Sequence, residues 1–298
     1  MVKYLMTGLM RVINYEKLEE KMNNNYKNRI ITISGEPVSG KSTTLKKMIE
    51  KLKQKGIKEE NIHYVQTGEI FRKYMNRIVE LIVNFDSREK AMEIARTPEI
   101  QDLIKDQKSL SDLMQTIAKV RNNRELVENF TVDEANKNKD FSEIREKVDH
   151  IIDTSMEKLG KKINSEKHPN EIWLIDSRLA FSNIPDSFSI RLTTNPEVAG
   201  KRLFQDKNRG KEDNCYRNEE EAKIARESRR KGEQKRYIKR YGIDLEDENN
   251  YNLVIDTSYV DIDKIADTIL ECESKYQKGI QFEKNIFHTD NKKDDETR

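Results

Sequence analysis

Short apolar runs alternate along the chain with longer stretches in which apolar residues recur every three or four positions. Five such runs occupy residues 30–33, 61–65, 172–175, 188–192 and 251–255, and the first is rich in β-branched residues. Their length predicts β-strands. The stretch after the first run carries Leu45, Met48 and Leu52 at helical spacing. Five strands alternating with helices predict an α/β fold.

The remaining pattern suggests how the chain is divided. Residues 1–28 have a loose helical period and are predicted to form a helical leader, whereas residues 275–298 are polar and predicted to be disordered. The domain between them, residues 29–274, contains a long helical insert over residues 76–165. Thr97-Pro98-Glu99 within it is typical of a helix start, with proline at the first helical position.

The first strand leads into Gly35-Glu36-Pro37-Val38-Ser39-Gly40-Lys41-Ser42, hereafter the glycine loop. Two glycines separated by four residues and followed by Lys and Ser are typical of a loop whose backbone N–H groups surround phosphate oxygens. Lys41 brings a cation to the phosphates, and the Ser42 hydroxyl is suited to hold Mg²⁺. We therefore predict a nucleoside triphosphate site with ATP and Mg²⁺ as cofactors. Its binding residues are Gly35, Ser39, Gly40, Lys41, Ser42 and Thr43.

Polar residues follow two other strands at their carboxyl ends, where ligands gather in open α/β sheets. Asp176 ends the third strand and is expected to support Mg²⁺ together with Ser42, the alternative being a carboxylate that caps the next turn. Thr67 and Arg72 follow the second strand, and Arg178 follows the third. The two guanidiniums suit a second phosphate group, although Arg72 is also consistent with a solvated helix surface.

A basic segment without apolar pattern, residues 206–218, precedes a helix on which Arg226, Arg230 and Arg236 can share one face. Such arginines either surround a phosphate group or belong to a solvated helix with weak ion pairs. A further set, Asp149, His150 and Asp153, gives only a weak indication of a metal site.

Composition narrows the classes of partner. Of 298 residues, 56 are Lys or Arg and 54 are Asp or Glu, so the net charge is only +2 and no overall field favours nucleic acid or membrane partners. The two cysteines, Cys215 and Cys272, form no motif, and no stretch approaches the roughly 20 apolar residues of a membrane helix. A cytoplasmic protein with a small-molecule substrate is expected.

Taken together, the motifs resemble the cytidylate kinase family of nucleoside monophosphate kinases. The resemblance is carried by the glycine loop and by residues 67–72, 176–180, 226–237 and 241–256. It implies a P-loop kinase fold with a five-stranded parallel sheet, in which residues 76–165 bind the acceptor and residues 206–240 form a lid. The implied reaction is transfer of the ATP γ-phosphate to CMP or dCMP. The implied catalytic residues are Lys41, Asp176, Arg226, Arg230 and Arg236, and the implied acceptor-binding residues are Thr67, Arg72 and Arg178.

The chain departs from the family pattern at several positions. Val38 replaces a usual glycine, Glu36 places a carboxylate near phosphates, and Leu179 stands where the bacterial branch has an aspartate. Residues 76–137 are longer than the corresponding family segment. Two alternatives therefore stay open: a P-loop kinase for another nucleotide or small metabolite, and a nucleotide-gated interaction protein that uses the helical insert as its binding surface.

Overall fold

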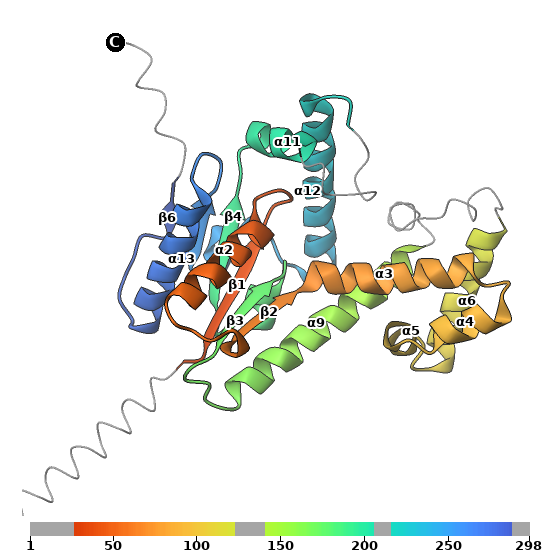
Figure 1. Ribbon diagram of the computed structural model, residues 1–298. Coiled ribbons are helices and arrows are strands. Elements are labelled where there is room, and N and C mark those ends of the chain that lie inside the picture. Colours follow the sequence, from red (N-terminus) through yellow and green to blue (C-terminus); the bar gives the residue numbers. More distant parts are fainter. Residues whose placement is uncertain (1–26, 123–140, 206–215, 288–298) are drawn as a thin grey trace, which may run out of the picture.

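The computed structural model describes residues 27–122, 141–205 and 216–287. Its centre is a parallel sheet with the strand order β2-β3-β1-β4-β5-β6 (Figure 1). The strands are β1 (Arg29–Gly35), β2 (Ile62–Gln66), β3 (Ile172–Asp176), β4 (Phe188–Thr193), β5 (Leu253–Asp256) and β6 (Asn285–Ile286). The predicted α/β class is confirmed, and each predicted strand is found within two residues of its expected position.

The central strand β1 places the glycine loop at the middle of the sheet edge. Ile30, Ile31 and Ile33 are almost completely buried because helices cover both faces of the strand. β1 pairs with β3 on one side, where Ile33 lies opposite Asp176, and with β4 on the other, where Gly35 lies opposite Leu192. The carboxyl ends of three neighbouring strands therefore meet beside the loop.

The prediction of a five-stranded sheet was wrong, because β6 adds a sixth strand beyond β5. Val254 lies opposite Asn285 in this pairing, and the Val254 amide donates to the Lys284 carbonyl at 2.8 Å. β6 has two residues and no apolar run, so periodicity does not reveal it; it is held by backbone pairing and by side chains around it. The P-loop kinase fold as a specific assignment is likewise not shown.

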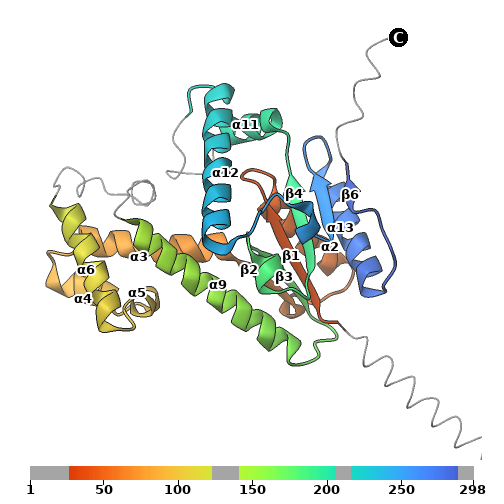
Figure 2. The same cartoon turned by 180° about the vertical axis from the view of Figure 1, so that it is seen from behind.

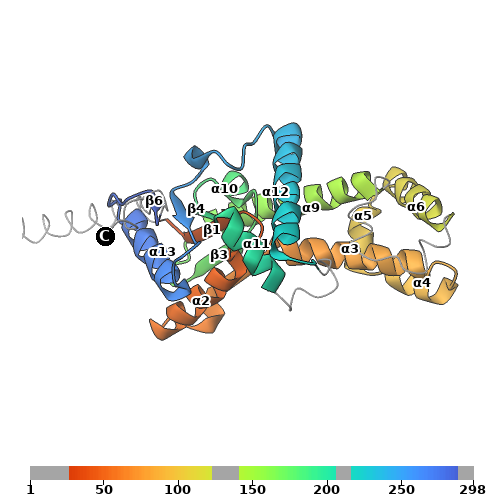
Figure 3. The same ribbon diagram turned by 90° about the horizontal axis from the view of Figure 1, so that it is seen from above.

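One face of the sheet is covered by α2 (Lys41–Gln54) and α13 (Ile262–Gln277), which lie side by side in Figures 1 and 3. Their apolar faces, including Met48 and Ile269, form one core with Ile31 and Phe188 of the sheet. Packing on the sheet fixes the start of α2, and hence the direction in which its N-terminal end points.

A second core lies under two long helices, α3 (Thr67–Val83) and α9 (Ser142–Asn164), which extend away from the sheet as an arm (Figures 1 and 2). The arm carries α4 (Arg88–Ala95), α5 (Pro98–Leu103) and α6 (Gln107–Arg121) at its far end. The predicted helix start at Thr97-Pro98 is confirmed, with Thr97 as the N-cap and Pro98 in the first turn. A short helix, α10 (Ala180–Asn183), follows β3, and the single-turn helices η1 (Glu59–Asn61) and η4 (Glu248–Asn250) precede β2 and β5.

Two further helices, α11 (Pro196–Gln205) and α12 (Glu219–Tyr241), pack against each other (Figure 2). α12 begins at the N-cap Asn218, whose side chain accepts from the Glu221 amide, and ends at Gly242 in the left-handed conformation. Within the described residues no helix is both long enough and apolar enough to cross a bilayer. Predictions for residues 1–26, 123–140, 206–215 and 288–298, including most of the helical leader and part of the basic segment, lie outside the described residues.

Candidate functional site

The glycine loop connects β1 to α2 through a tight turn. A Cβ atom at Gly35 would lie 2.5 Å from the Leu192 carbonyl oxygen, so only glycine fits there. Gly40 is the N-cap of α2 with φ 82°, and no side chain caps the first turn of the helix. The Thr257 hydroxyl donates to the Ser39 carbonyl at 3.1 Å and holds the loop from the side of β5. The uncapped N–H groups and the positive end of the α2 dipole suit an anion at this point.

Lys41 points back into the loop. Its ammonium group donates to the carbonyl oxygens of Gly35 at 2.9 Å and Glu36 at 3.0 Å. Burial, with a smaller contribution from the Arg178 guanidinium, lowers the pKa of Lys41 from 10.5 to about 7. A negatively charged ligand beside the amine would favour its charged form and raise this pKa.

A polar chain links Ser42, the residue after Lys41, to the ends of β2 and β3. The Ser42 hydroxyl donates to the Asp176 carboxylate at 3.2 Å and accepts from the Gln66 amide at 3.2 Å. The Thr67 hydroxyl donates to the Asp176 backbone carbonyl at 3.1 Å. The structure therefore brings together three of the predicted residues, Ser42, Asp176 and Thr67. Their roles toward a ligand stay predictions.

Two arginines contact the carboxylate of Glu36, the residue after the first loop glycine. Arg191 of β4 donates to one carboxylate oxygen at 3.3 Å, and Arg226 of α12 donates to the other. Arg226 also donates to the backbone carbonyls of Pro37 at 3.4 Å and Thr194 at 3.5 Å. These contacts connect α12 to the loop.

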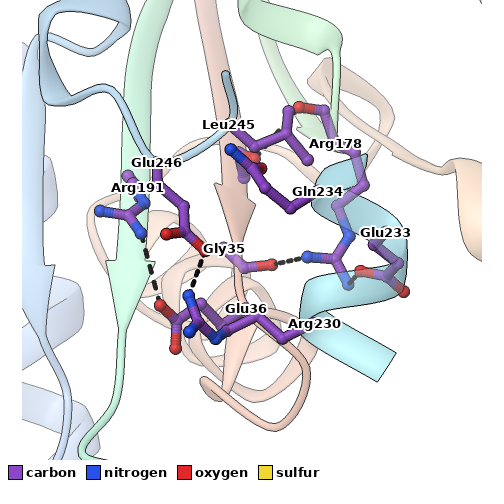
Figure 4. A pocket seen from close by; sticks show the side chains of 10 residues that line it. Gly35, Glu36, Arg178, Arg191, Arg230, Glu233, Gln234, Leu245 and Glu246 are labelled. Atoms are coloured by element: carbon purple, nitrogen blue, oxygen red, sulfur yellow. Dashed lines mark hydrogen bonds and ion pairs between the residues drawn. The ribbon is translucent and has the colours of Figure 1, made fainter. Parts of the chain in front are cut away.

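Further arginine–carboxylate pairs surround a small pocket beside the loop (Figure 4). Arg178 contacts the Gly35 carbonyl and pairs with Glu233 at 2.7 Å, while Arg230 pairs with Glu246. Burial acts to raise the pKa of Glu233, but Arg178 and Arg229 more than offset this, so the pKa lies below its usual range. The pocket measures about 20 Å³, room for about one water molecule, so the side chains fill most of the space between the pairs.

The remaining predicted residues lie on α12, α3 and α2. Arg236 lies against Tyr237, its guanidinium carbon 5.4 Å from the ring centroid. Arg72 lies half-buried in the first turns of α3, and Thr43 is exposed on α2. Among the described residues no group of three or more His, Cys, Asp or Glu side chains could hold a metal ion, so the weak indication from Asp149, His150 and Asp153 is not supported.

Arg191 and Glu233 are residues of this site that were not predicted. Arg191 lies within an apolar run, although a charged residue in a buried parallel strand is itself a signal of a partner nearby. Glu233 lies on an α12 face that was assigned to arginines alone, and only the packing of α12 against the loop places it beside Arg178.

Comparisons with known proteins bear on the activity. No family model matches the chain. A 121-residue stretch, 41% of the chain, is 31% identical to an S-adenosylmethionine-dependent nucleotide dehydratase of Lacinutrix mariniflava, and this match spans 23% of that protein's length. A solved structure of an uncharacterized protein from Eubacterium ventriosum aligns with 83% of this chain and 99% of its own, at 14% identity and a TM-score of 0.41. A likeness at this level carries no argument about function.

These findings contradict the predicted cytidylate kinase. The curated relative is named as a dehydratase and depends on S-adenosylmethionine, so transfer of a γ-phosphate to CMP or dCMP and the cofactors ATP and Mg²⁺ are not supported. The physical reason lies in the motifs: glycine loops and strand-end arginines bind phosphate groups, which many reactions of nucleotides share. The lid arginines also differ from expectation, because Arg226 and Arg230 are paired with carboxylates.

Proposed function

We propose that this chain is an enzyme that acts on nucleotides and that its glycine loop binds the phosphate groups of the nucleotide. The observation that carries the proposal is the position of Lys41, a half-buried cation inside a loop that opens on the uncapped N-terminus of α2. The match to part of a protein named for its action on nucleotides supports the same class of substrate.

The residues around the loop fit a nucleotide better than they fit S-adenosylmethionine. That cofactor carries a positively charged sulfonium and no phosphate. Lys41, Arg178, Arg191 and Arg226 bring hydrogen-bond donors to the carboxyl edge of the sheet, where each arginine is paired with a carboxylate. These donors suit phosphate oxygens, and they are the reason for proposing a nucleotide rather than the sulfonium as the ligand.

The proposed site also includes Thr67, Arg72 and Arg178, beside the carboxyl ends of β2 and β3. Thr67 is anchored to Asp176, and Arg178 reaches the first loop glycine. We infer that these residues hold the part of the nucleotide beyond the phosphates in the loop, by hydrogen bonds to sugar hydroxyls or to a further phosphate.

The test is calorimetric titration of nucleoside mono-, di- and triphosphates into the wild-type protein and the Lys41→Ala variant. One charge-assisted hydrogen bond contributes about 1.5–3 kcal/mol, so Lys41→Ala is expected to weaken phosphate-dependent binding roughly ten- to hundredfold. Lys46→Ala, at an exposed lysine on the same helix, is the matched control and should bind as the wild type does. Equal affinities for wild type and Lys41→Ala would contradict the proposed site. A parallel titration with S-adenosylmethionine shows whether that molecule binds independently of Lys41.

A further inference from the structure

Glu36 is an acidic residue inside a loop suited to anions, and its position is unusual for that reason. A carboxylate near bound phosphates repels them, which opposes the proposed function of the loop. Yet Glu36 is not directed to solvent: its side chain is 15% exposed and lies between those of Arg226, 1% exposed, and Arg191, 9% exposed. Both guanidiniums are thus removed from water and face one carboxylate.

Two buried guanidiniums need a negative partner, because an unpaired buried charge is strongly destabilising. Glu36 supplies that partner from the loop itself. Arg226 is held in addition by the carbonyls of Pro37 and Thr194 and by Glu227, so its position does not depend on Glu36 alone. The two arginines together form a fork of donors whose geometry suits a carboxylate and a phosphate equally.

We propose that Arg191 and Arg226 form an anion subsite in which the Glu36 carboxylate takes the place of a phosphate group of the ligand. The ligand class is a nucleoside di- or triphosphate, or free pyrophosphate, whose terminal phosphate exchanges with Glu36 while Lys41 and the start of α2 hold the adjacent phosphate. This inference rests on the proposed phosphate site. It adds Arg191 to the proposed phosphate-binding residues. It also means that the Glu36 carboxylate competes with the terminal phosphate of the ligand for the two arginines.

The exchange has two measurable consequences. Replacing Glu36 with the neutral, isosteric Gln removes the competitor and the repulsion, so the subsite should bind pyrophosphate more tightly. The same change leaves two buried guanidiniums without a carboxylate between them, so the variant should be less stable until an anion is added. A purely structural ion pair would produce only the loss of stability.

The experiment compares Glu36→Gln with Glu273→Gln in sodium chloride and in pyrophosphate at equal ionic strength. Glu273 is a matched control: it is buried, and it pairs with Arg29 at 2.7 Å, at the opposite end of β1 from the loop. We expect Glu36→Gln to bind pyrophosphate at least tenfold more tightly than the wild type. Its melting temperature should rise with pyrophosphate by several degrees more than that of Glu273→Gln. Adding Arg191→Gln to Glu36→Gln should abolish the gain.

Equal responses of Glu36→Gln and Glu273→Gln to pyrophosphate would overturn the subsite and leave Glu36 as a structural tie. If Glu36→Gln does not fold in chloride, Glu36→Asp is the second variant, because it keeps the negative charge on a side chain that is too short to reach both arginines as Glu36 does. Glu36→Asp is expected to bind pyrophosphate more tightly than the wild type, by a smaller factor than Glu36→Gln. An affinity equal to that of the wild type would also overturn the inference. Failure of the proposed function is distinct, because it appears as nucleotide binding by the wild type that does not depend on Lys41.

Discussion

Lys41 shows how the surroundings of a single residue shape the site. Its ammonium group donates to two backbone carbonyls and lies near Arg178. Desolvation dominates over the favourable effects of Asp176 and Glu233, and the pKa falls to about 7. The folded protein therefore holds this lysine close to the midpoint of its titration at neutral pH.

This pKa predicts a pH dependence of the free energy of unfolding. Between pH 7 and 10.5 the unfolded chain keeps its proton on Lys41 while the folded chain has lost it, so stability contributed by this residue rises with pH across that window. Lys41→Met should lack the rise. Denaturant unfolding of both proteins at about pH 7 and about pH 9.5, within that window, measures it, with Lys46→Met as control. Parallel stability curves for wild type and Lys41→Met would show that Lys41 is not desolvated in the folded chain.

At the scale of elements, α12 is attached to the molecule mainly through charge and close helix packing. Of its 23 residues only Ala222 and Arg226 are buried. Ion pairs of Arg178 with Glu233 and of Arg226 with Glu36 connect the helix to the loop, and α11 packs along its N-terminal part. Because such contacts are weaker than an apolar core, the position of α12 is expected to respond to a ligand bound at the proposed site.

The contact between α11 and α12 gives a prediction at this scale. A Cβ atom at Gly200 would lie 2.7 Å from the Lys223 Cβ, so Gly200→Ala must force the two helices apart. We expect a loss of about 1–3 kcal/mol from such overpacking. Gly232, a glycine within α12, is the control, because a Cβ atom added there would have no neighbour within 4 Å.

Gly232→Ala should instead gain about 0.5–1 kcal/mol, because alanine favours the helix. Chemical denaturation of both variants measures whether the free energy of unfolding falls for Gly200→Ala and rises for Gly232→Ala. A Gly200→Ala variant as stable as Gly232→Ala would show that the two helices are not in close contact.

At the scale of the whole molecule, two separate cores stabilise the sheet and the arm. One core joins the sheet to α2 and α13, and the other runs from the opposite face along α3 and α9. β6 and the residues before it extend the first core, since Phe282 packs edge-on against Phe188 with ring centroids 5.8 Å apart. The sixth strand is thus attached by side chains as well as by backbone pairing.

Replacing Phe282 with Ala tests this attachment. The loss of a half-buried ring and its aromatic contact should lower the free energy of unfolding by about 1–3 kcal/mol. Ile280→Ala, at a side chain that is 52% exposed, should change stability by no more than about 0.5 kcal/mol. Equal effects from both variants would mean that the segment before β6 contributes nothing to the core.

The reaction could not be inferred from the sequence, although the phosphate chemistry could be proposed. The glycine loop, Lys41 and the strand-end residues Asp176 and Arg178 are local patterns, and the structure gathers them at one edge of the sheet. Such patterns indicate which chemical group a site could bind, not what is done to that group. The kinase assignment went beyond this limit and was wrong for that reason.

The sequence by itself determined the five main strands, the helices that cover them and the tight loop, because hydrophobic period and glycine spacing are local properties of the chain. Only the tertiary structure decided the sixth strand, the partners of Glu36 and the position of Glu233 beside Arg178. The physical reason is the range of the interactions. Backbone pairing at a sheet edge and ion pairs between residues 55 to 190 positions apart leave no periodic trace in the sequence.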